Sequence, residues 1–184
     1  TLPYCIRGSW MDVKIIDNFL PEEEFEGLQN SIINNDNFPL YIQHSVAYES
    51  NNEEWKKKYW NWYATHIVYD NDQIVSQDAF PVIQNLFVPR IKEVHPLRSL
   101  MRIKINFYPY TDRVKEHQPH FDYTFDHYGA IFSLNTCNGF TRLKDGSKID
   151  SVENRFFIFD SSQFHNSSTT SNAQARYNIN FNFL

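Results

Sequence analysis

His120-Phe121-Asp122 is the stretch of sequence that decides the fold, together with His165, 43 positions after Asp122, and Arg176, 11 positions after that histidine. Two imidazoles and one carboxylate on one face of a metal ion leave its opposite face open, which suits an Fe(II) ion that has to bind further ligands. Residues two apart on a strand point to the same side. We therefore predict that His120 and Asp122 share one strand and that His165 reaches them from another.

The sequence around this motif predicts a series of short strands. Residues 101–107 and 128–135 alternate between apolar and polar side chains. Residues 154–160 form an almost continuous apolar run, which is typical of a strand buried on both faces. Residues 176–184 alternate strictly, with aromatic or aliphatic residues at the odd positions. The even positions of this last segment carry Arg176, Asn178, Asn180 and Asn182.

Two helices and a few more strands are predicted before this region. The first helix starts at Leu20-Pro21-Glu22, with proline in its first turn and acidic residues near its N-terminus, and it runs to about Asn34. The second runs from Ser76 to about Val94, and Pro89 is expected to kink or interrupt it. Strands are expected over residues 13–19, 41–48 and 60–69. Helices followed by many short strands predict an α+β, mainly β domain whose β part is a sandwich or an open barrel.

Length and composition narrow the class of protein. The 184 residues fit one domain with a sizeable core, which we expect to span residues 11–184. Residues 1–10 resemble a remnant of an expression vector and are not expected to belong to the fold. The net charge of −5, without a block of Lys or Arg, disfavours a nucleic-acid partner. The only cysteines, Cys5 and Cys137, lack metal-type spacing, so a reducing, cytoplasmic location is expected. No apolar run has the length of a membrane span.

Residues 99–184 resemble the double-stranded β-helix core, a jelly-roll or cupin-like barrel, of the Fe(II)/2-oxoglutarate-dependent oxygenases. Within that superfamily they are similar to the prolyl-4-hydroxylase-like branch with its small microbial and phage members. The segments that carry the resemblance are His120-Phe121-Asp122, Phe132-Ser133-Leu134-Asn135 with Gly139-Phe140-Thr141, Asn154-Arg155-Phe156-Phe157-Ile158-Phe159-Asp160 with His165, and Arg176-Tyr177-Asn178-Ile179-Asn180-Phe181. The N-terminal helices would then support the barrel.

The resemblance implies a set of ligands and the residues that bind them. His120, Asp122 and His165 would bind Fe(II), and 2-oxoglutarate and O₂ would be cosubstrates. Arg176 would bind the far carboxylate of 2-oxoglutarate, because arginine keeps its charge when buried and offers a bidentate fork.

Further cosubstrate contacts are expected in the same barrel. Tyr108 matches approximately a family tyrosine that lines the pocket. Ser133 stands where many members of the branch have a tyrosine, so the far carboxylate needs another donor, for which Thr141 and Tyr108 are candidates. Asn135 and Asn178 share an inward direction on their predicted strands.

The implied activity is oxidative decarboxylation of 2-oxoglutarate coupled to hydroxylation of a C–H bond. The substrate expected from the family is a prolyl residue in a peptide or protein, followed by free amino acids and other small metabolites. Nucleic-acid demethylases of the class typically end in Arg-x-Asn-x-Thr-Phe-Arg, and residues 176–182 lack the Thr and the closing Arg.

Other interpretations remain open at this point. One is a cupin-like metal-binding protein without 2-oxoglutarate chemistry, which would have no use for Arg176 as an anchor. Another is a non-catalytic jelly-roll binding module, which would need neither the metal ligands nor the arginine. His117 and His127 flank the motif and are competing candidates for the metal ligands.

Overall fold

The computed structural model describes residues 13–46 and 58–184. The predicted remnant at residues 1–10 and most of the segment between the strands expected over 41–48 and 60–69 lie outside the described residues. In chain order, the helices and strands are β1 (Lys14–Ile16), α1 (Glu22–Ile32), β2 (Tyr41–Gln43), β3 (Tyr63–Asp70), β4 (Gln73–Ile74), α3 (Ala79–Val94), β5 (Leu100–Pro109), β6 (Tyr128–Ser133), β7 (Phe140–Leu143), β8 (Lys148–Asp150), β9 (Arg155–Asp160), β10 (His165–Ser167) and β11 (Ala175–Phe183).

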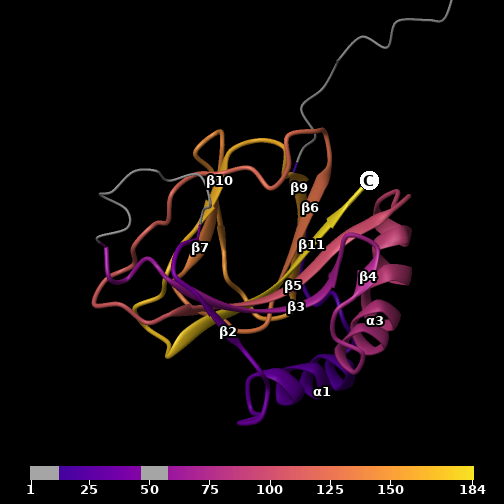
Figure 1. Cartoon of the computed structure of the whole chain (residues 1–184), viewed down its shortest axis with the longest axis horizontal. Helices are drawn as coiled ribbons and strands as arrows, with labels where there is room; N and C mark the ends of the chain where they lie inside the picture. The colour runs from indigo at the N-terminus through magenta and orange to yellow at the C-terminus, as the bar shows by residue number, and fades with distance from the viewer. Residues whose placement is uncertain (1–12, 47–57) are drawn as a thin grey trace, which may run out of the picture.

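The strands form two sheets that face each other. The large sheet has the order β1-β9-β6-β11-β5-β3-β2, with β4 paired to β3, and the small sheet has the order β10-β7-β8. Isolated bridges join Glu116 to Ser168 and His120 to His165, so residues 116–120 extend the small sheet beyond β10. Figure 1 shows β7 and β10 on one side of the large sheet and α1 and α3 on the other.

The order of the strands is that of a double-stranded β-helix. From β5 to β11 the chain passes between the sheets, so that β5, β6, β9 and β11 build the large sheet while residues 116–120, β7, β8 and β10 build the small one. Every pairing between these strands is antiparallel in the described part of the chain. The predicted fold class, an α+β jelly-roll core with supporting N-terminal helices, is confirmed.

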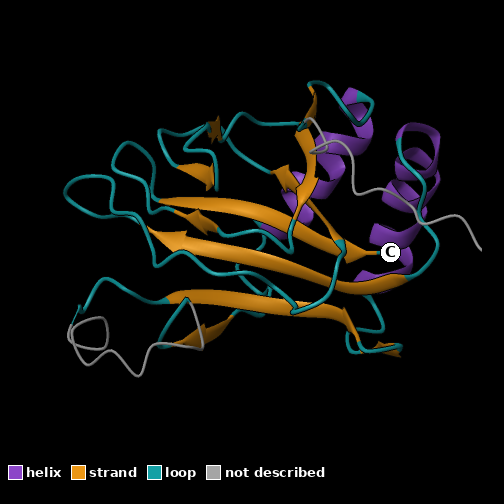
Figure 2. Ribbon diagram, turned by 90° about the horizontal axis from the view of Figure 1, so that it is seen from above, coloured by secondary structure: helices purple, strands orange, loops and turns teal. Residues whose placement is uncertain are grey.

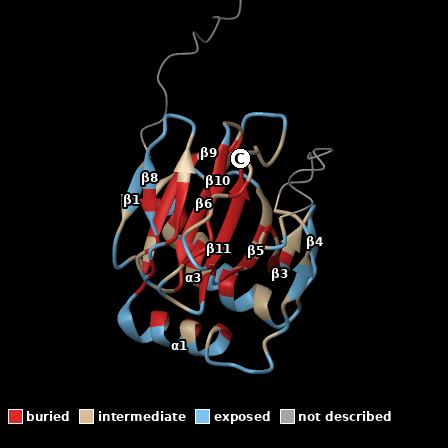
Figure 3. Cartoon of the chain, turned by 90° about the vertical axis from the view of Figure 1, so that its left-hand side faces the viewer, coloured by how far each residue is buried: buried red, intermediate tan, exposed pale blue. Residues whose placement is uncertain are grey.

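The main hydrophobic core lies between the large sheet and the helices. Phe25, Leu28 and Ile32 of α1 and Ile83, Phe87 and Ile91 of α3 are spaced three or four apart, so each helix buries one face. These faces pack against the odd-numbered side chains of β11 and their neighbours in β5, β6 and β9. The ribbon in Figure 2 has both helices beside the long strands, and Figure 3 shows α1 exposed on its outer side.

Several boundaries differ from the predictions for identifiable reasons. The second helix begins at Ala79 and not at Ser76. It continues through Pro89, and in this turn the Arg90 side chain donates to the Leu86 carbonyl at 2.7 Å. Asn154 lies outside β9 because its φ is +57°, and its side chain instead bonds both the N–H and the carbonyl of Leu20. This amide therefore joins the start of α1 to the barrel.

Truncation of Phe132 is expected to destabilise the whole domain. Phe132 is fully buried on β6, and its ring contacts Phe87 of α3 at 4.9 Å and Phe25 of α1 at 6.0 Å between centroids. Phe132→Ala should lower the free energy of unfolding by about 3–5 kcal/mol, measured by chemical denaturation. Phe125→Ala, at a half-exposed ring, should cost about 1 kcal/mol or less. Equal losses in both variants would contradict this description of the core.

Candidate metal centre

The inner face of the barrel is unusually polar along β5 and β11. Because side chains alternate along a strand, the apolar odd-numbered residues of β11 face the helices and its even-numbered residues face the barrel interior. Four cross-strand pairs share this interior face: Arg102 with Asn182, Lys104 with Asn180, Asn106 with Asn178, and Tyr108 with Arg176. The alternation therefore places four polar pairs in a line across the interior.

His120, Asp122 and His165 lie together at one end of this polar face. Their candidate ligand atoms all lie within 4.8 Å of one another, and Nε2 of His165 is 3.9 Å from Oδ2 of Asp122. Within residues 13–46 and 58–184, this is the one group of three or more His, Cys, Asp or Glu side chains close enough to share a metal ion. His117 and His127, the competing histidines, are not part of it.

Backbone contacts orient both imidazoles. Nδ1 of His120 lies 3.2 Å from the Gln118 carbonyl, and Nδ1 of His165 lies 3.0 Å from the Gln163 carbonyl. A carbonyl can only accept, so Nδ1 carries the proton in each neutral ring and Nε2 keeps its lone pair for a metal. Burial and the neighbouring His165 lower the pKa of His120 to about 4, which keeps this ring neutral near pH 7.

The Asp122 carboxylate is held by three donors from different elements. Arg102 donates to Oδ1 at 2.8 Å, while Ser161 and Asn182 donate to Oδ2 at 2.7 and 2.8 Å. Burial alone would raise the pKa of Asp122, but His165, Arg102 and Lys104 and the Ser161 hydroxyl hold it well below its usual range. An ionised carboxylate has about four lone-pair sites, so one remains for a cation.

The prediction that His120 and Asp122 share a strand is wrong. Strand pairing ends at His120, which exchanges backbone hydrogen bonds with His165, and Asp122 lies in the loop that follows. Two features hold the carboxylate beside the histidines all the same. The Asp122 N–H donates to the Ser161 carbonyl, and the side chain is bound by Arg102 and Asn182.

Arg176 is fully buried without an anionic partner among the described residues. Nη1 donates to the carbonyls of Phe140 and Ser168, and Nη2 donates to Oγ1 of Thr141. In residues 13–46 and 58–184, Nε has no hydrogen-bond partner. The guanidinium also lies 5.5 Å from the Tyr108 ring centroid. A buried cation with only neutral partners and an unused donor fits the carboxylate of a ligand.

The other predicted cosubstrate residues fall into two groups. Tyr108, Thr141 and Asn178 line an inner chamber of about 40 Å³ together with His120, Asp122 and His165.

Ser133 and Asn135 are outside the lining of that chamber. Ser133 is buried at the end of β6, and its hydroxyl has no hydrogen-bond partner among the described residues. Asn135 lies beyond the end of β6, where its amide bonds the backbone of Ala175 and Tyr177. It therefore fastens the start of β11 and does not project into the barrel.

A wider cavity of about 360 Å³ leads into the inner chamber. The two share Tyr63, Lys104, His120 and Asp122 in their linings. Aromatic side chains border the outer cavity, which we call the mouth: Tyr63, Phe121, Tyr123 and Phe164. Trp60 is not in the lining of the chamber or the mouth, and it packs on His117 at 5.6 Å between ring centroids.

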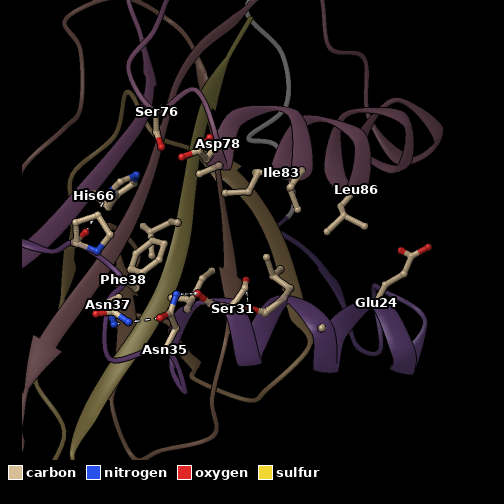
Figure 4. Close-up of a pocket in the computed structure, with 17 residues that line it drawn as sticks. Glu24, Ser31, Asn35, Asn37, Phe38, His66, Ser76, Asp78, Ile83 and Leu86 are labelled. Atoms are coloured by element: carbon tan, nitrogen blue, oxygen red, sulfur yellow. Dashed lines mark hydrogen bonds between the residues drawn. The ribbon is translucent and has the colours of Figure 1, made fainter.

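A larger hollow of about 570 Å³ lies on the opposite side of the large sheet, between α1 and α3 (Figure 4). Leu28, Ile83 and Leu86 form much of its wall, and polar residues such as Asn35, Ser76 and Asp78 stand at its rim. It contains no metal-type group among the described residues, so its size alone does not make it the functional site.

Several residues of the site were not predicted from the sequence: Tyr63, Arg102, Lys104, Ser161, Asn180 and Asn182. Four of them had a usable signal, because the polar residues of β5 recur at every second position just as those of β11 do. Tyr63 and Ser161 had none, since only tertiary structure brings them to the barrel.

Comparisons with known proteins agree with this geometry. No protein-family model and no curated protein sequence matches the chain. A Pseudomonas putida prolyl-4-hydroxylase structure matches with 13% identity over 93% of this chain and 91% of that one, at a TM-score of 0.61. A prolyl hydroxylase from Trichoplax adhaerens, in complex with a hypoxia-inducible-factor peptide fragment, matches with 14% identity. The match covers 93% of this chain and 83% of that one, at a TM-score of 0.61.

A third match is a non-heme α-ketoglutarate-dependent epimerase from nogalamycin biosynthesis, with 12% identity over 94% of this chain and 77% of that one, at a TM-score of 0.64. The chain has the fold of the Fe(II)/2-oxoglutarate oxygenases. Identities this low show the fold alone, and the reactions in this set differ. The chemistry of this chain therefore has to be argued from its own residues.

Removal of His165 is expected to abolish tight binding of a divalent metal. His165→Ala should weaken Mn(II) binding by at least about 100-fold, because loss of even an outer partner of a metal ligand costs 10–100-fold. Isothermal titration calorimetry measures the effect, and circular dichroism confirms that the variant is folded. His117→Gln is the matched comparison and should leave the affinity within about threefold. The reverse result would make His117, not His165, the ligand.

Gly139 is expected to be required for the position of Arg176. A Cβ at this residue would lie 2.8 Å from Cδ of Arg176 and 2.8 Å from the Thr169 carbonyl oxygen, so one of them has to move. Gly139→Ala should lower the free energy of unfolding by about 1–3 kcal/mol. Gly27→Ala in α1 meets nothing within 4 Å and should raise it by about 0.4–1 kcal/mol. Denaturation of both variants tests the contrast, and a neutral Gly139→Ala would refute it.

Proposed function

We propose that this protein is a non-haem Fe(II) dioxygenase that couples oxidative decarboxylation of 2-oxoglutarate to hydroxylation of a C–H bond. The observation that carries the proposal is the fully buried Arg176, which has no anionic partner among the described residues and lies behind Tyr108 and Thr141 in the wall of the chamber. A cupin-like metal protein or a binding module would not need a buried, uncompensated cation at this position.

The donor set fits Fe(II). Two neutral imidazoles and one ionised carboxylate on one side of a site are the arrangement that non-haem Fe(II) oxygenases use, with positions left for other ligands. When bound, Fe(II) would promote the reaction of O₂ with 2-oxoglutarate. This reaction yields succinate and CO₂ and leaves one oxygen atom for the substrate.

The protein's own residues would hold and orient these groups. Arg102, Asn182 and Ser161 keep Asp122 ionised and directed at the histidines. Arg176 would bind the far carboxylate of 2-oxoglutarate through its unused Nε–H. The Thr141 hydroxyl would continue to accept the hydrogen bond from Nη2 of Arg176. Burial raises the pKa of Tyr108, so its phenol stays protonated and can donate a hydrogen bond in the chamber.

The substrate we propose is a prolyl residue in a peptide or protein, or a free amino acid of similar size. The first suggestion is supported by the shared fold with prolyl hydroxylases, one of them in complex with a peptide. The aromatic border of the mouth, with Phe164 half-exposed, suits either kind of substrate. A nucleic-acid substrate is disfavoured by the net charge of −5. No helix among the described residues is long and apolar enough to cross a membrane.

Replacement of Arg176 tests the proposed cosubstrate. Arg176→Ala should weaken binding of 2-oxoglutarate to the Zn(II)-loaded protein by about 2–5 kcal/mol, because a buried charge-assisted contact is lost. Arg176→Lys should recover part of the affinity, since it restores the charge without the fork. Binding of the metal itself should change little in either variant.

The wild-type protein provides the decisive activity measurement. With Fe(II) and ascorbate it should convert 2-oxoglutarate to succinate slowly even without a substrate, and Arg176→Ala should not. If the wild-type protein neither binds nor turns over 2-oxoglutarate, the proposed function is wrong.

A further inference from the structure

Lys104 places an unpartnered cation at the junction of the inner chamber and the mouth. It is half-buried on β5 and lines both cavities. His120 and Asp122 line the same two cavities, so Lys104 lies near the metal group. Yet it donates no hydrogen bond and makes no ion pair within 4.0 Å to any residue in the described part of the chain. A cation in this position invites an anionic ligand.

The other charges of the site already have counter-charges. Arg102 is bound to Asp122 at 2.8 Å and also donates to Asn182 at 3.1 Å. Under the proposed function, Fe(II) and Arg176 together more than balance the two carboxylates of 2-oxoglutarate. Asp70 influences Lys104 only at a distance. The charge of Lys104 is therefore left for a third molecule, which is the substrate.

The residue opposite Lys104 also has a side-chain oxygen without a hydrogen-bond partner in the described structure. Asn180 is its neighbour in the β5–β11 register, it lines the same chamber, and its buried side-chain oxygen accepts no hydrogen bond in the described structure. Lys104 and Asn180 thus present an ammonium donor and an amide acceptor side by side. The neighbouring pair, Asn106 and Asn178, is by contrast bonded to itself at 3.1 Å.

We infer that the substrate carries a carboxylate close to the C–H bond that is oxidised, and that Lys104 binds this carboxylate while Asn180 accepts from an N–H next to it. The inference rests on the proposed function and names its substrate class. A carboxylate of this kind has two sources, the α-carboxylate of a free amino acid and, in a peptide, the side chain of an Asp or Glu next to the prolyl residue that is oxidised. The mouth of about 360 Å³ gives access to Lys104 past Phe121, Tyr123 and Phe164.

The first experiment compares acids with their neutral amides. Succinate formation by the Fe(II) protein is measured with each of the protein L-amino acids and with its α-carboxamide. A second arm uses end-blocked hexapeptide pools with one fixed Asp or Glu, and matched pools with Asn or Gln. We expect at least one acid, in one arm, to raise turnover above the substrate-free rate while its amide does not. The responding arm identifies the source of the carboxylate.

The second experiment replaces Lys104. Lys104→Met should weaken binding of the responding acid to the protein loaded with Zn(II) and 2-oxoglutarate by about tenfold or more, measured by calorimetry. Lys104→Arg should restore part of that affinity. Affinity for 2-oxoglutarate should stay within about twofold of wild type. Lys92→Met, at an exposed lysine of α3, is the matched control and should change none of these values.

The inference would be overturned by equal stimulation by acids and amides, by no response to any acid in either arm, or by unchanged acid binding in Lys104→Met. Loss of 2-oxoglutarate binding in that variant would reassign Lys104 to the cosubstrate and also refute the inference. None of these results touches the proposed function, which fails only if the wild-type protein does not bind or turn over 2-oxoglutarate.

Discussion

The Asp122 carboxylate is the point on which the rest of the site depends. It is buried, and burial of an anion is unfavourable unless hydrogen bonds and opposite charge compensate for it. Arg102 comes from β5, Asn182 from β11 and Ser161 from the turn after β9, so three strands must be correctly placed before the carboxylate is satisfied. The same contacts hold the loop of Asp122 against the barrel, although that loop belongs to neither sheet.

The two faces of the large sheet divide stability from chemistry. On the helix side, the ring of Phe87 packs on Phe132 and on Phe181, each at 4.9 Å between centroids. These side chains are apolar and need no hydrogen bonds. On the inner side, β5 and β11 present amides, cations and a phenol, some of them unpartnered. Buried polar groups without hydrogen-bond partners destabilise a fold unless a ligand binds them. Their concentration on one face of the sheet therefore indicates where ligands bind.

Two glycines leave room for the side chains that hold this site. A Cβ on Gly129 would lie 2.7 Å from Cβ of Ser161, whose hydroxyl donates to Asp122. Gly139 leaves the corresponding room for Arg176. Neither glycine has a positive φ, so close packing, and not backbone freedom, is what requires them. Metal ligands and buried arginine are thus positioned by residues that carry no chemistry of their own.

The sequence pattern was sufficient to predict two central strands, β11 from the alternation of residues 176–182 and β9 from the apolar run before Asp160. It also predicted that Arg176 points inward, because successive side chains on a strand point to opposite faces. The order of His120, Asp122, His165 and Arg176 likewise pointed to the resemblance that the fold comparison supports. Local pattern could not place Asn135, which bonds the backbone of its neighbour strand, or show that Asp122 lies beyond the end of a strand. Nor could it show that Lys104 and Asn180 stand opposite each other without partners. Strand register and the pairing of charges depend on contacts between residues far apart in the chain, and only the tertiary structure decides those.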